Sequence, residues 1–367
     1  MNSKYICHLT SVHHRLDTRV YYKEILSLKK HFDKVAFIVA DGLGNDRTKE
    51  DIGIFDVGKE KSRIKRILHS PQRIYRKALE LDADVYHFHD PELMIIGRKL
   101  LRKGKKVIYD IHEDVPQQLM GKPYLNRQVR PVISGMLRKF ENKHAARYTA
   151  LITATPKIAE RFLKINPDTF VINNYPKKNE LFSSAANLPK KHQICYVGVI
   201  TRIRGLLQLV DSLVYSDVKL LLAGRFESKA FEEELKSRQG WKNVDYIGQV
   251  DRKELAGIMS ESKAGMVTFL PYPNHVDAQP NKIFEYMSAG LPVIGSDFEL
   301  WKQIIADNNC GVCVNPASPE EIAKGINSIV NSEEKMNLYG KNGRRLIETT
   351  YNWEAEEVKL NNIYKEL

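Results

Sequence analysis

Two carboxylates and a lysine lie close together in the segment 277–297, whose sequence is DAQPNKIFEYMSAGLPVIGSD. Asp277 opens a loop, and a helix is predicted to begin near Pro280, because proline suits the first helical turn. A helix N-terminus offers free N–H groups and a partial positive charge to a pyrophosphate, and Lys282 adds a full charge. Glu285, one turn deeper, could accept hydrogen bonds from a ribose diol. An ordinary helix with a capping loop fits the same residues.

A second group of cations follows a short apolar run in the sequence YVGVITRIRG, residues 196–205. Arg202 and Arg204 lie at a predicted strand-to-helix turn that begins with Gly198, and arginine can hold phosphate oxygens with two parallel hydrogen bonds. A basic residue that merely caps the turn is the alternative. A further glycine turn, around Gly224, follows the next predicted strand.

Histidines end two predicted strands of the first half. His112 follows VIYDI at the end of a strand among polar residues, whereas a lone histidine is more often structural. The pattern His87-Phe-His89 also occurs among metal ligands, but Asp90-Pro91 directly after it favours a helix cap.

The elements that position these residues alternate between short apolar runs and amphipathic stretches, which indicates βαβ units and parallel sheets. Strands are predicted at 5–9, 35–40, 53–57, 84–89, 106–111, 150–154 and 169–173, and again within 193–199, 218–224, 243–248, 264–270, 291–296 and 311–316. Helices are predicted at 19–31, 62–80, 91–103, 127–147, 203–214, 228–239, 251–261, 280–289, 299–306 and 319–330, and the helical stretch 333–366 is interrupted near 351–353.

The alternation stops once, in a polar stretch that is rich in lysine and serine, and then begins again. We therefore expect an N-terminal Rossmann-like domain at 1–180, a linker at 181–192, and a C-terminal Rossmann-like domain at 193–347. A helix at 348–367 is expected to pack back towards the first domain. Two doubly wound α/β domains predict a ligand site in an interdomain cleft, because ligands bind at the carboxyl ends of parallel strands.

The 367 residues carry a net charge of +12, and the basic segments 59–80, 98–106 and 127–147 all lie in the first half. These basic segments are either the solvated faces of surface helices or a surface that binds an anionic membrane. Nucleic acid is disfavoured because no DNA-binding or RNA-binding motif accompanies the charge. No signal peptide and no apolar run long enough to span a bilayer are found, so a cytoplasmic location is expected. Cys310 and Cys313 form C-x-x-C without a second pair, and a short buried strand explains them.

The segment 277–297 resembles the donor-binding signature of glycosyltransferase family four, which is retaining and has the GT-B fold. Its second half, NKIFEYMSAGLPVIGSD, matches closely, whereas Asp277 stands where the family usually has glutamate. The turn with Gly198 resembles the family's Gly-Arg-x-x-x-x-Lys-Gly, with Arg204 at the lysine position and Val199 at the arginine position. The stretches TSVHHRLDTRVYYKE and YDIHEDVPQQL resemble bacterial surface-polysaccharide enzymes.

The resemblance implies transfer of a hexose from a nucleoside-diphosphate sugar, with UDP as the commonest base, to a hydroxyl of a glycan or lipid-linked acceptor. It implies that the domain at 1–180 binds the acceptor and that the domain at 193–347 binds the nucleotide sugar. By this resemblance, the residues that act near the reacting sugar are Asp277, His112, Arg204 and Lys282. The residues that bind the nucleotide are Glu285, Arg202, Gly198, Gly224 and Asn281. No metal or other cofactor is implied, because cations and a helix dipole neutralise the leaving diphosphate. A nucleotide-sugar epimerase of the same fold and a basic nucleic-acid-binding protein are the alternatives. Peripheral binding to the inner face of the plasma membrane would suit a lipid-linked acceptor.

Overall fold

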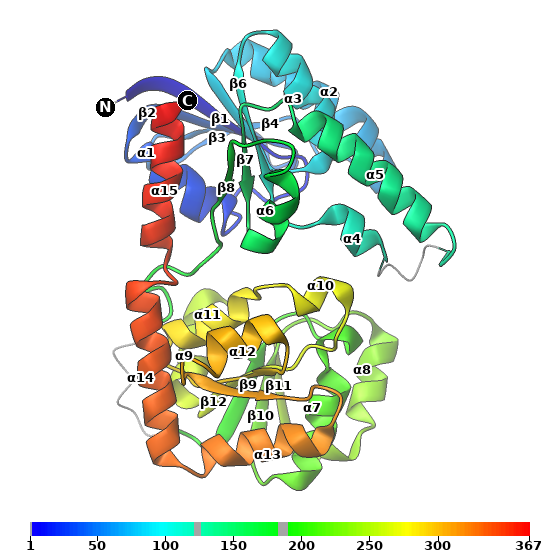
Figure 1. Ribbon diagram of the computed structural model, residues 1–367, viewed down its shortest axis with the longest axis vertical. Helices are drawn as coiled ribbons and strands as arrows, with labels where there is room; N and C mark the ends of the chain where they lie inside the picture. The colour runs from blue at the N-terminus through cyan, green and yellow to red at the C-terminus, as the bar shows by residue number, and fades with distance from the viewer. Residues whose placement is uncertain (1, 121–125, 183–189) are drawn as a thin grey trace. The chain divides into compact units, whose positions relative to one another are not determined.

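The computed structural model describes residues 2–120, 126–182 and 190–367, and the chain divides into two compact units. The first comprises Met1–Asn174 and Ala355–Leu367, and the second comprises Tyr175–Glu354 (Figure 1). Most of the expected linker at 181–192 lies outside the described residues.

The first unit is built on an eight-stranded sheet in the order β3-β4-β2-β1-β5-β6-β7-β8. Its neighbouring strands are parallel, except that β3 runs antiparallel to β4 at the edge. All seven predicted strands of this half are confirmed, and β3 was not predicted because it holds only two exposed polar residues. The strands are β1 (Asn2–Leu9), β2 (Phe32–Val39), β3 (Asp46–Arg47), β4 (Gly53–Asp56), β5 (Val85–Phe88), β6 (Lys106–Ile111), β7 (Ala150–Thr153) and β8 (Thr169–Val171).

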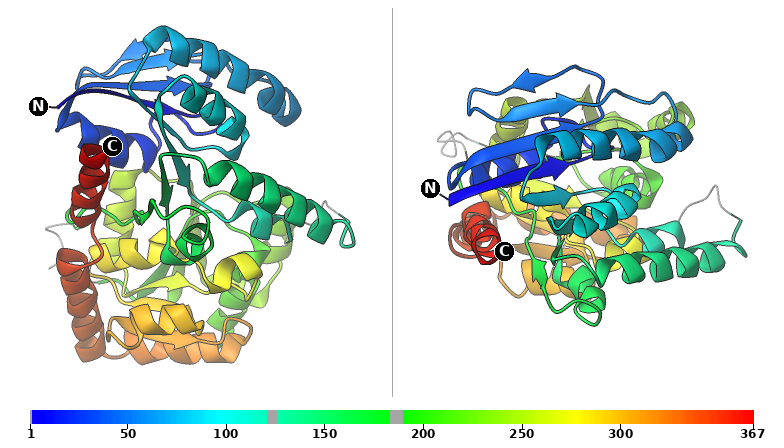
Figure 2. Two further views of the ribbon diagram at one scale, coloured as in Figure 1. Left: turned by 45° about the horizontal axis from the view of Figure 1, so that its top comes forward. Right: turned by 90° about the horizontal axis from the view of Figure 1, so that it is seen from above.

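Three helices form one layer on this sheet: α2 (Arg63–Leu81), α3 (Met94–Arg102) and α5 (Arg130–Ala145). They bury apolar residues together with alternate strand residues such as Cys7, Tyr86 and Phe88. Figures 1 and 2 show the three helices as neighbours. The residues between these strand positions, His8 and His87, therefore face the opposite side of the sheet. On that side lie η1 (Val20–Ile25), α1 (Leu26–Lys29) and Tyr364 of α15 (Trp353–Glu366).

The second unit holds a six-stranded, fully parallel sheet in the order β11-β10-β9-β12-β13-β14. The strands are β9 (Gln193–Val197), β10 (Lys219–Ala223), β11 (Val244–Gly248), β12 (Ala264–Val267), β13 (Val293–Ser296) and β14 (Gly311–Val314). Its helices include α7 (Leu206–Ser212), α8 (Lys229–Lys236), α9 (Arg252–Glu261), α10 (Pro273–Val276), α11 (Asn281–Ser288), α12 (Glu299–Ile305), α13 (Pro319–Val330) and α14 (Glu333–Thr349). The predicted α/β architecture of two Rossmann-like sheets is thus confirmed.

Besides β3, three short α-helices were not predicted. They are α4 (Val115–Met120), α6 (Pro156–Phe162) and α10, each of seven residues or fewer. The predicted interruption of the last helical stretch is confirmed, because α14 ends at Thr349 and α15 begins at Trp353. Among the described residues, no helix is both long enough and apolar enough to cross a bilayer.

Candidate functional site

The N-terminal end of α11 is a positively charged helix end in the second unit. The helix begins at Asn281. Pro280, which was expected in the first helical turn, is instead the N-cap, one residue before that turn. No side chain among the described residues caps this end, and its first turn contains no acidic residue. The first N–H groups of such a helix have no partner within the helix and suit an anion. Gly290, at φ 68°, terminates the helix as predicted, with hydrogen bonds Gly290 N to Met287 O and Leu291 N to Tyr286 O.

Two glycine turns lie against each other, and the first of them contacts the Lys282 side chain of α11. Gly198 follows β9 at φ 138°, and Gly224 follows β10 at φ 142°. A Cβ atom on Gly224 would lie 1.8 Å from the carbonyl oxygen of Gly198, and one on Gly198 would lie 2.2 Å from Lys282 Nζ. Only glycine allows this backbone conformation and this close approach. The predicted residues Gly198, Gly224 and Lys282 are therefore brought together.

Lys282 and Arg204 place two cations over the Gly198 turn. Arg204 Nη1 would lie 3.5 Å from a Cβ atom on Gly198, and it donates to the carbonyl oxygen of Val199 at 3.2 Å. The Lys282 ammonium lies 5.6 Å from the centre of the Tyr196 ring. Burial, together with the nearby Arg204 charge, lowers the pKa of Lys282 to about 8. Two like charges held close together form a site that a diphosphate would neutralise.

Glu285 lies one turn further along α11 and is engaged by a residue that the sequence did not reveal. Arg252 Nη1 of α9 donates to Glu285 Oε1 at 2.7 Å, and Arg252 Nη2 donates to Glu180 Oε1 at 2.5 Å. The nearby carboxylates raise the pKa of Arg252, against the effect of its burial. No sequence motif joins these three residues, because they come from separate elements.

The remaining predicted residues of the second unit are exposed. The Arg202 guanidinium forms an ion pair with Glu234 of α8 and lies 5.3 Å from the centre of the Phe231 ring. A role for Arg202 on a phosphate would require that ion pair to break. Asn281 is the first residue of α11, and Asp277 follows α10 in the loop that leads to α11.

His112 belongs to the first unit and takes part in a buried polar network. Its Nε2 lies 2.7 Å from Asp110 Oδ2 and 3.3 Å from His89 Nδ1. Arg19 binds Asp110 with two hydrogen bonds, of 3.1 and 2.9 Å. The Arg19 charge and the His112 contacts hold the pKa of Asp110 well below its usual value despite burial.

Asp90 stands at the N-cap of a short helix, as predicted, but it accepts only with its backbone oxygen there, from Leu93 N at 2.9 Å. Its side chain makes no cap hydrogen bond to η2 (Pro91–Leu93). Instead Asp90 Oδ2 accepts hydrogen bonds from Thr10 Oγ1 at 2.7 Å and from Ser11 N at 2.6 Å. These hydrogen bonds hold the loop after β1 in place, and no local pattern indicates a pairing between residues 80 positions apart.

Two family models match the chain, one in each unit. The model for Glycosyltransferase Family 4 matches residues 25–174, and the model for Glycosyl transferases group 1 matches residues 177–346. Phosphatidyl-myo-inositol mannosyltransferase of Mycobacterium leprae is 23% identical over 82% of this chain and 79% of its own length. Spore coat protein SA of Bacillus subtilis is 24% identical over 53% of this chain and 54% of its own length.

Solved structures agree with the fold over the whole chain. Sucrose-phosphate synthase from Thermosynechococcus elongatus matches with a TM-score of 0.79 at 17% identity, covering 99% of this chain and 98% of that one. HepE of Anabaena in complex with UDP-glucose matches with a TM-score of 0.73 at 15% identity, covering 99% of this chain and 100% of that one. The chain therefore belongs to glycosyltransferase family 4 and is a glycosyltransferase of the GT-B fold.

Proposed function

We propose that this glycosyltransferase moves a hexose from a UDP-sugar to a hydroxyl of a glycan or lipid-linked acceptor, with retention, in bacterial polysaccharide or glycoconjugate synthesis. The observation that carries the proposal is the pair Lys282 and Arg204, held over the Gly198 turn at the uncapped end of α11. This arrangement supplies charge and N–H groups for a diphosphate. The solved relative HepE, which forms a complex with UDP-glucose, supports the choice of base.

In the proposed reaction the bond between the anomeric carbon and the diphosphate oxygen breaks while the acceptor oxygen bonds to the same face of the sugar. The leaving phosphate oxygen takes the acceptor proton, so no protein nucleophile is needed. Lys282, Arg204 and the end of α11 stabilise the charge that develops on the leaving group. Glu285 holds the ribose, and Asp277 and His112 orient the transferred sugar.

A panel of nucleoside-diphosphate sugars tests the proposal. UDP-sugars are expected to raise the melting temperature of the protein, and one of them is expected to yield an acceptor-linked product with retained configuration. Stabilisation by UDP-sugars with release of free sugar and nucleotide, and no product on any acceptor, would instead fit an epimerase. No stabilisation by any donor of the panel would contradict the proposed site.

The depressed pKa of Lys282 predicts that donor affinity falls above neutral pH. Below pH 8 the lysine is charged with or without donor, whereas above its free pKa of about 8 donor binding must take up a proton. The Kd for a UDP-sugar is therefore expected to rise about tenfold between about pH 7 and about pH 9. Titration calorimetry measures this, and Lys282→Arg, which stays charged, should give a nearly flat profile. An equally flat profile in the wild type would show that Lys282 does not face the diphosphate.

Transfer should not depend on an exchangeable metal. Among the described residues, two groups of ligating side chains lie close enough to share an ion. Both groups belong to the first unit, whereas α11 belongs to the second. Two cations already serve the proposed diphosphate site. The initial rate with EDTA should therefore match the untreated rate within about twofold. A rate that EDTA abolishes and manganese restores would contradict this.

The layer of α2, α3 and α5 carries an exposed surface that fits an anionic membrane. On α5 and just before it, Val129, Val132, Met136 and Phe140 are exposed and recur at helical spacing, with Val132 60% and Met136 68% exposed. Exposed basic residues of the layer are Arg63, Lys65, Arg76, Arg102, Arg127, Arg138, Lys139, Lys143 and Arg147. Basic and apolar residues together favour helices that lie in a membrane interface. We propose that the enzyme binds peripherally to the inner face of the plasma membrane.

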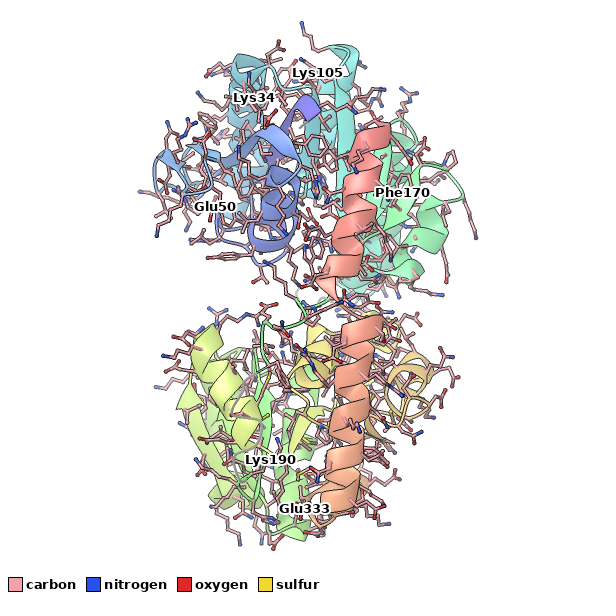
Figure 3. All side chains as sticks on the ribbon, turned by 90° about the vertical axis from the view of Figure 1, so that its left-hand side faces the viewer. Lys34, Glu50, Lys105, Phe170, Lys190 and Glu333 are labelled. Carbon is pink, nitrogen blue, oxygen red and sulfur yellow. The ribbon has the colours of Figure 1, made fainter. Side chains whose placement is uncertain are left out.

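Reversal of two charges on α5 is expected to weaken this membrane binding. Arg138→Glu with Lys139→Glu should cost at least about 2 kcal/mol, roughly a 30-fold fall in partitioning into anionic vesicles. Lys105, labelled in Figure 3, is less suitable for charge reversal, because its Nζ forms an ion pair with Asp82 Oδ1 at 2.7 Å that the substitution would also remove.

The measurement is co-sedimentation with phosphatidylglycerol and phosphatidylcholine vesicles at low and high salt. Lys229→Glu with Lys253→Glu, two exposed positions of the second unit, is the matched control and should bind like the wild type. Equal recovery of the wild type with both lipids would defeat the proposal.

A further inference from the structure

Three histidines and a glutamate meet in the interior of the first unit: His8 on β1, Glu24 on η1, and His87 and His89 on and directly after β5. His89 is 3% exposed and the other three are fully buried. His8 pairs with His87 in the parallel register of the two strands, so both rings project from one face of the sheet. His89, two residues on, shares that face. Glu24 reaches them from a π-helical turn, a rare conformation that is frequent at functional sites.

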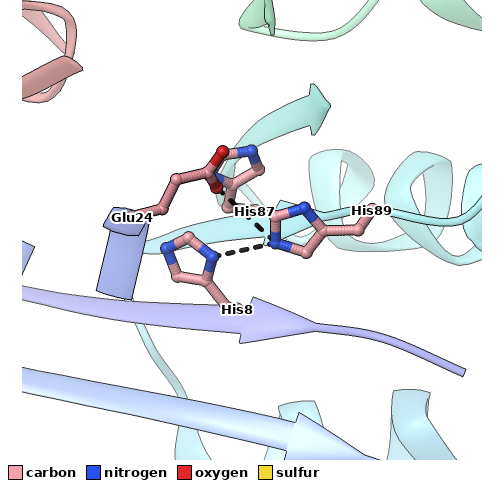
Figure 4. A group of neighbouring side chains, drawn as sticks. All are labelled: His8, Glu24, His87 and His89. Carbon is pink, nitrogen blue, oxygen red and sulfur yellow. Dashed lines mark hydrogen bonds and ion pairs between the residues drawn. The ribbon is translucent and has the colours of Figure 1, made fainter. Parts of the chain in front are cut away.

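The four side chains converge on one point, as Figure 4 shows. One ligating atom from each lies within 4.8 Å of the other three. His8 Nδ1 lies 2.9 Å from His89 Nε2, and Glu24 Oε2 lies 4.0 Å from His89 Nε2. Ligands around a first-row metal, with bonds of about 2.0–2.2 Å, lie about 3–3.5 Å from one another. The observed separations bracket that value, so only small side-chain shifts would be needed.

The other nitrogen of each ring is held by a second residue. Asp110 Oδ2 lies 3.1 Å from His89 Nδ1. The Tyr364 hydroxyl lies 2.7 Å from His87 Nδ1 and 3.4 Å from His8 Nε2. Histidines that bind metals are oriented in this way, by a carboxylate or another fixed partner on the nitrogen away from the ion.

Hydrogen bonds alone do not satisfy this cluster. Nε2 of His87 and both carboxylate oxygens of Glu24 are buried, and among the described residues none of them has a hydrogen bond of ordinary geometry. The contact of Glu24 Oε1 with Arg19 Nε at 2.9 Å is an ion pair, and the same arginine also binds Asp110. Buried polar atoms without hydrogen bonds are uncommon in folded proteins, and an ion in the cluster would engage His87 Nε2 and one oxygen of Glu24, while Arg19 keeps the other.

We propose that His8, Glu24, His87 and His89 form a structural site for one divalent transition metal of the zinc type. Three imidazoles and one carboxylate are ligands that suit Zn²⁺, and four protein ligands complete a tetrahedral shell. The ion would join β1, β5 and η1, and through Tyr364 it would fix α15. All four ligands belong to the first unit, and their burial protects the ion from brief exposure to EDTA. The proposal does not depend on the reaction proposed above.

The test uses the full-length chain, carrying an affinity tag without histidine and purified from zinc-supplemented medium. Mass spectrometry of the elements should find about one zinc per chain after dialysis. Unfolding in guanidinium with EDTA and refolding without metal should lower the melting temperature, and zinc should restore it. Cobalt added to the refolded chain should give the visible absorption of a tetrahedral site. A chain that binds neither ion, and whose melting temperature neither ion changes, would overturn the proposal.

Substitutions locate the ion. Glu24→Gln and His87→Gln should each reduce bound zinc to under about a tenth of an equivalent and remove the cobalt absorption, because each deletes a ligand. His192→Gln, at an exposed histidine of the second unit, should keep the full equivalent. Tyr364→Phe should retain the ion but weaken binding by about 10–100-fold, through the lost contact with the histidines. Full zinc content in both ligand variants would refute the site, and should they fail to fold, the refolding experiment on the wild type decides alone.

Discussion

Replacement of Lys282 by methionine is expected to lower turnover by about 10²–10³-fold, the usual cost of losing one preorganised group that stabilises a developing anion. The ammonium lies so close to the Gly198 turn that a Cβ atom there would be 2.2 Å from it. Methionine keeps the length of the side chain and removes only its charge. Steady-state rates with a UDP-sugar and its acceptor give the measurement, and a melting curve checks the fold.

Lys229→Met, at the exposed first residue of α8, is the matched control and should keep the wild-type rate. Arg204→Ala should act in the same direction as Lys282→Met, because both cations serve the same diphosphate. A folded Lys282→Met variant with normal turnover would remove Lys282 from the site. A folded Arg204→Ala variant with normal turnover would turn attention to Arg202 as the second cation.

The sequence predicted those features that local chemistry determines. Apolar runs of four to eight residues became strands because both faces of a parallel sheet are buried. Helix α11 was predicted within one residue, since Pro280 and Gly290 favour its two ends. The grouping of Lys282 with Gly198 and Gly224 followed from the family motif. The positive φ angles that require glycine at both turns could be seen only in the structure.

Contacts between distant residues could not be predicted in the same way. The ion pair of Arg252 with Glu285 joins α9 to α11, and nothing in either segment indicates the other. The pairing of His8 with His87 depends on which strands are neighbours and on their register, which no local pattern of residues sets. The motif His87-Phe-His89 carried a signal for ligands, but Asp90-Pro91 favoured a cap. Asp90 does take the N-cap position, and its side chain binds the loop after β1, which no local pattern indicated.

Glu285→Gln is expected to weaken donor binding by about 1.5–3 kcal/mol, the usual cost of a lost hydrogen bond to a charged group. Arg252 engages Oε1 of this carboxylate, and we expect the ribose hydroxyls to bond to Oε2. Calorimetry with a UDP-sugar measures the change. The substitution also weakens the ion pair with Arg252, so a lower affinity by itself would not prove contact with the ribose.

Two comparisons separate the ion pair from the ribose contact. Arg252→Gln removes the pair and keeps the carboxylate, and because the Arg252 side chain is 45% exposed, the pair should be worth at most about 1 kcal/mol. This variant should therefore bind donor much as the wild type does. UDP should bind the wild type more tightly than its 2′,3′-dideoxy analogue, and in Glu285→Gln this preference should largely vanish, as expected for two groups that interact directly. If the preference for the ribose hydroxyls persists in Glu285→Gln, the carboxylate does not hold the ribose, and its role is to fix α9 against α11.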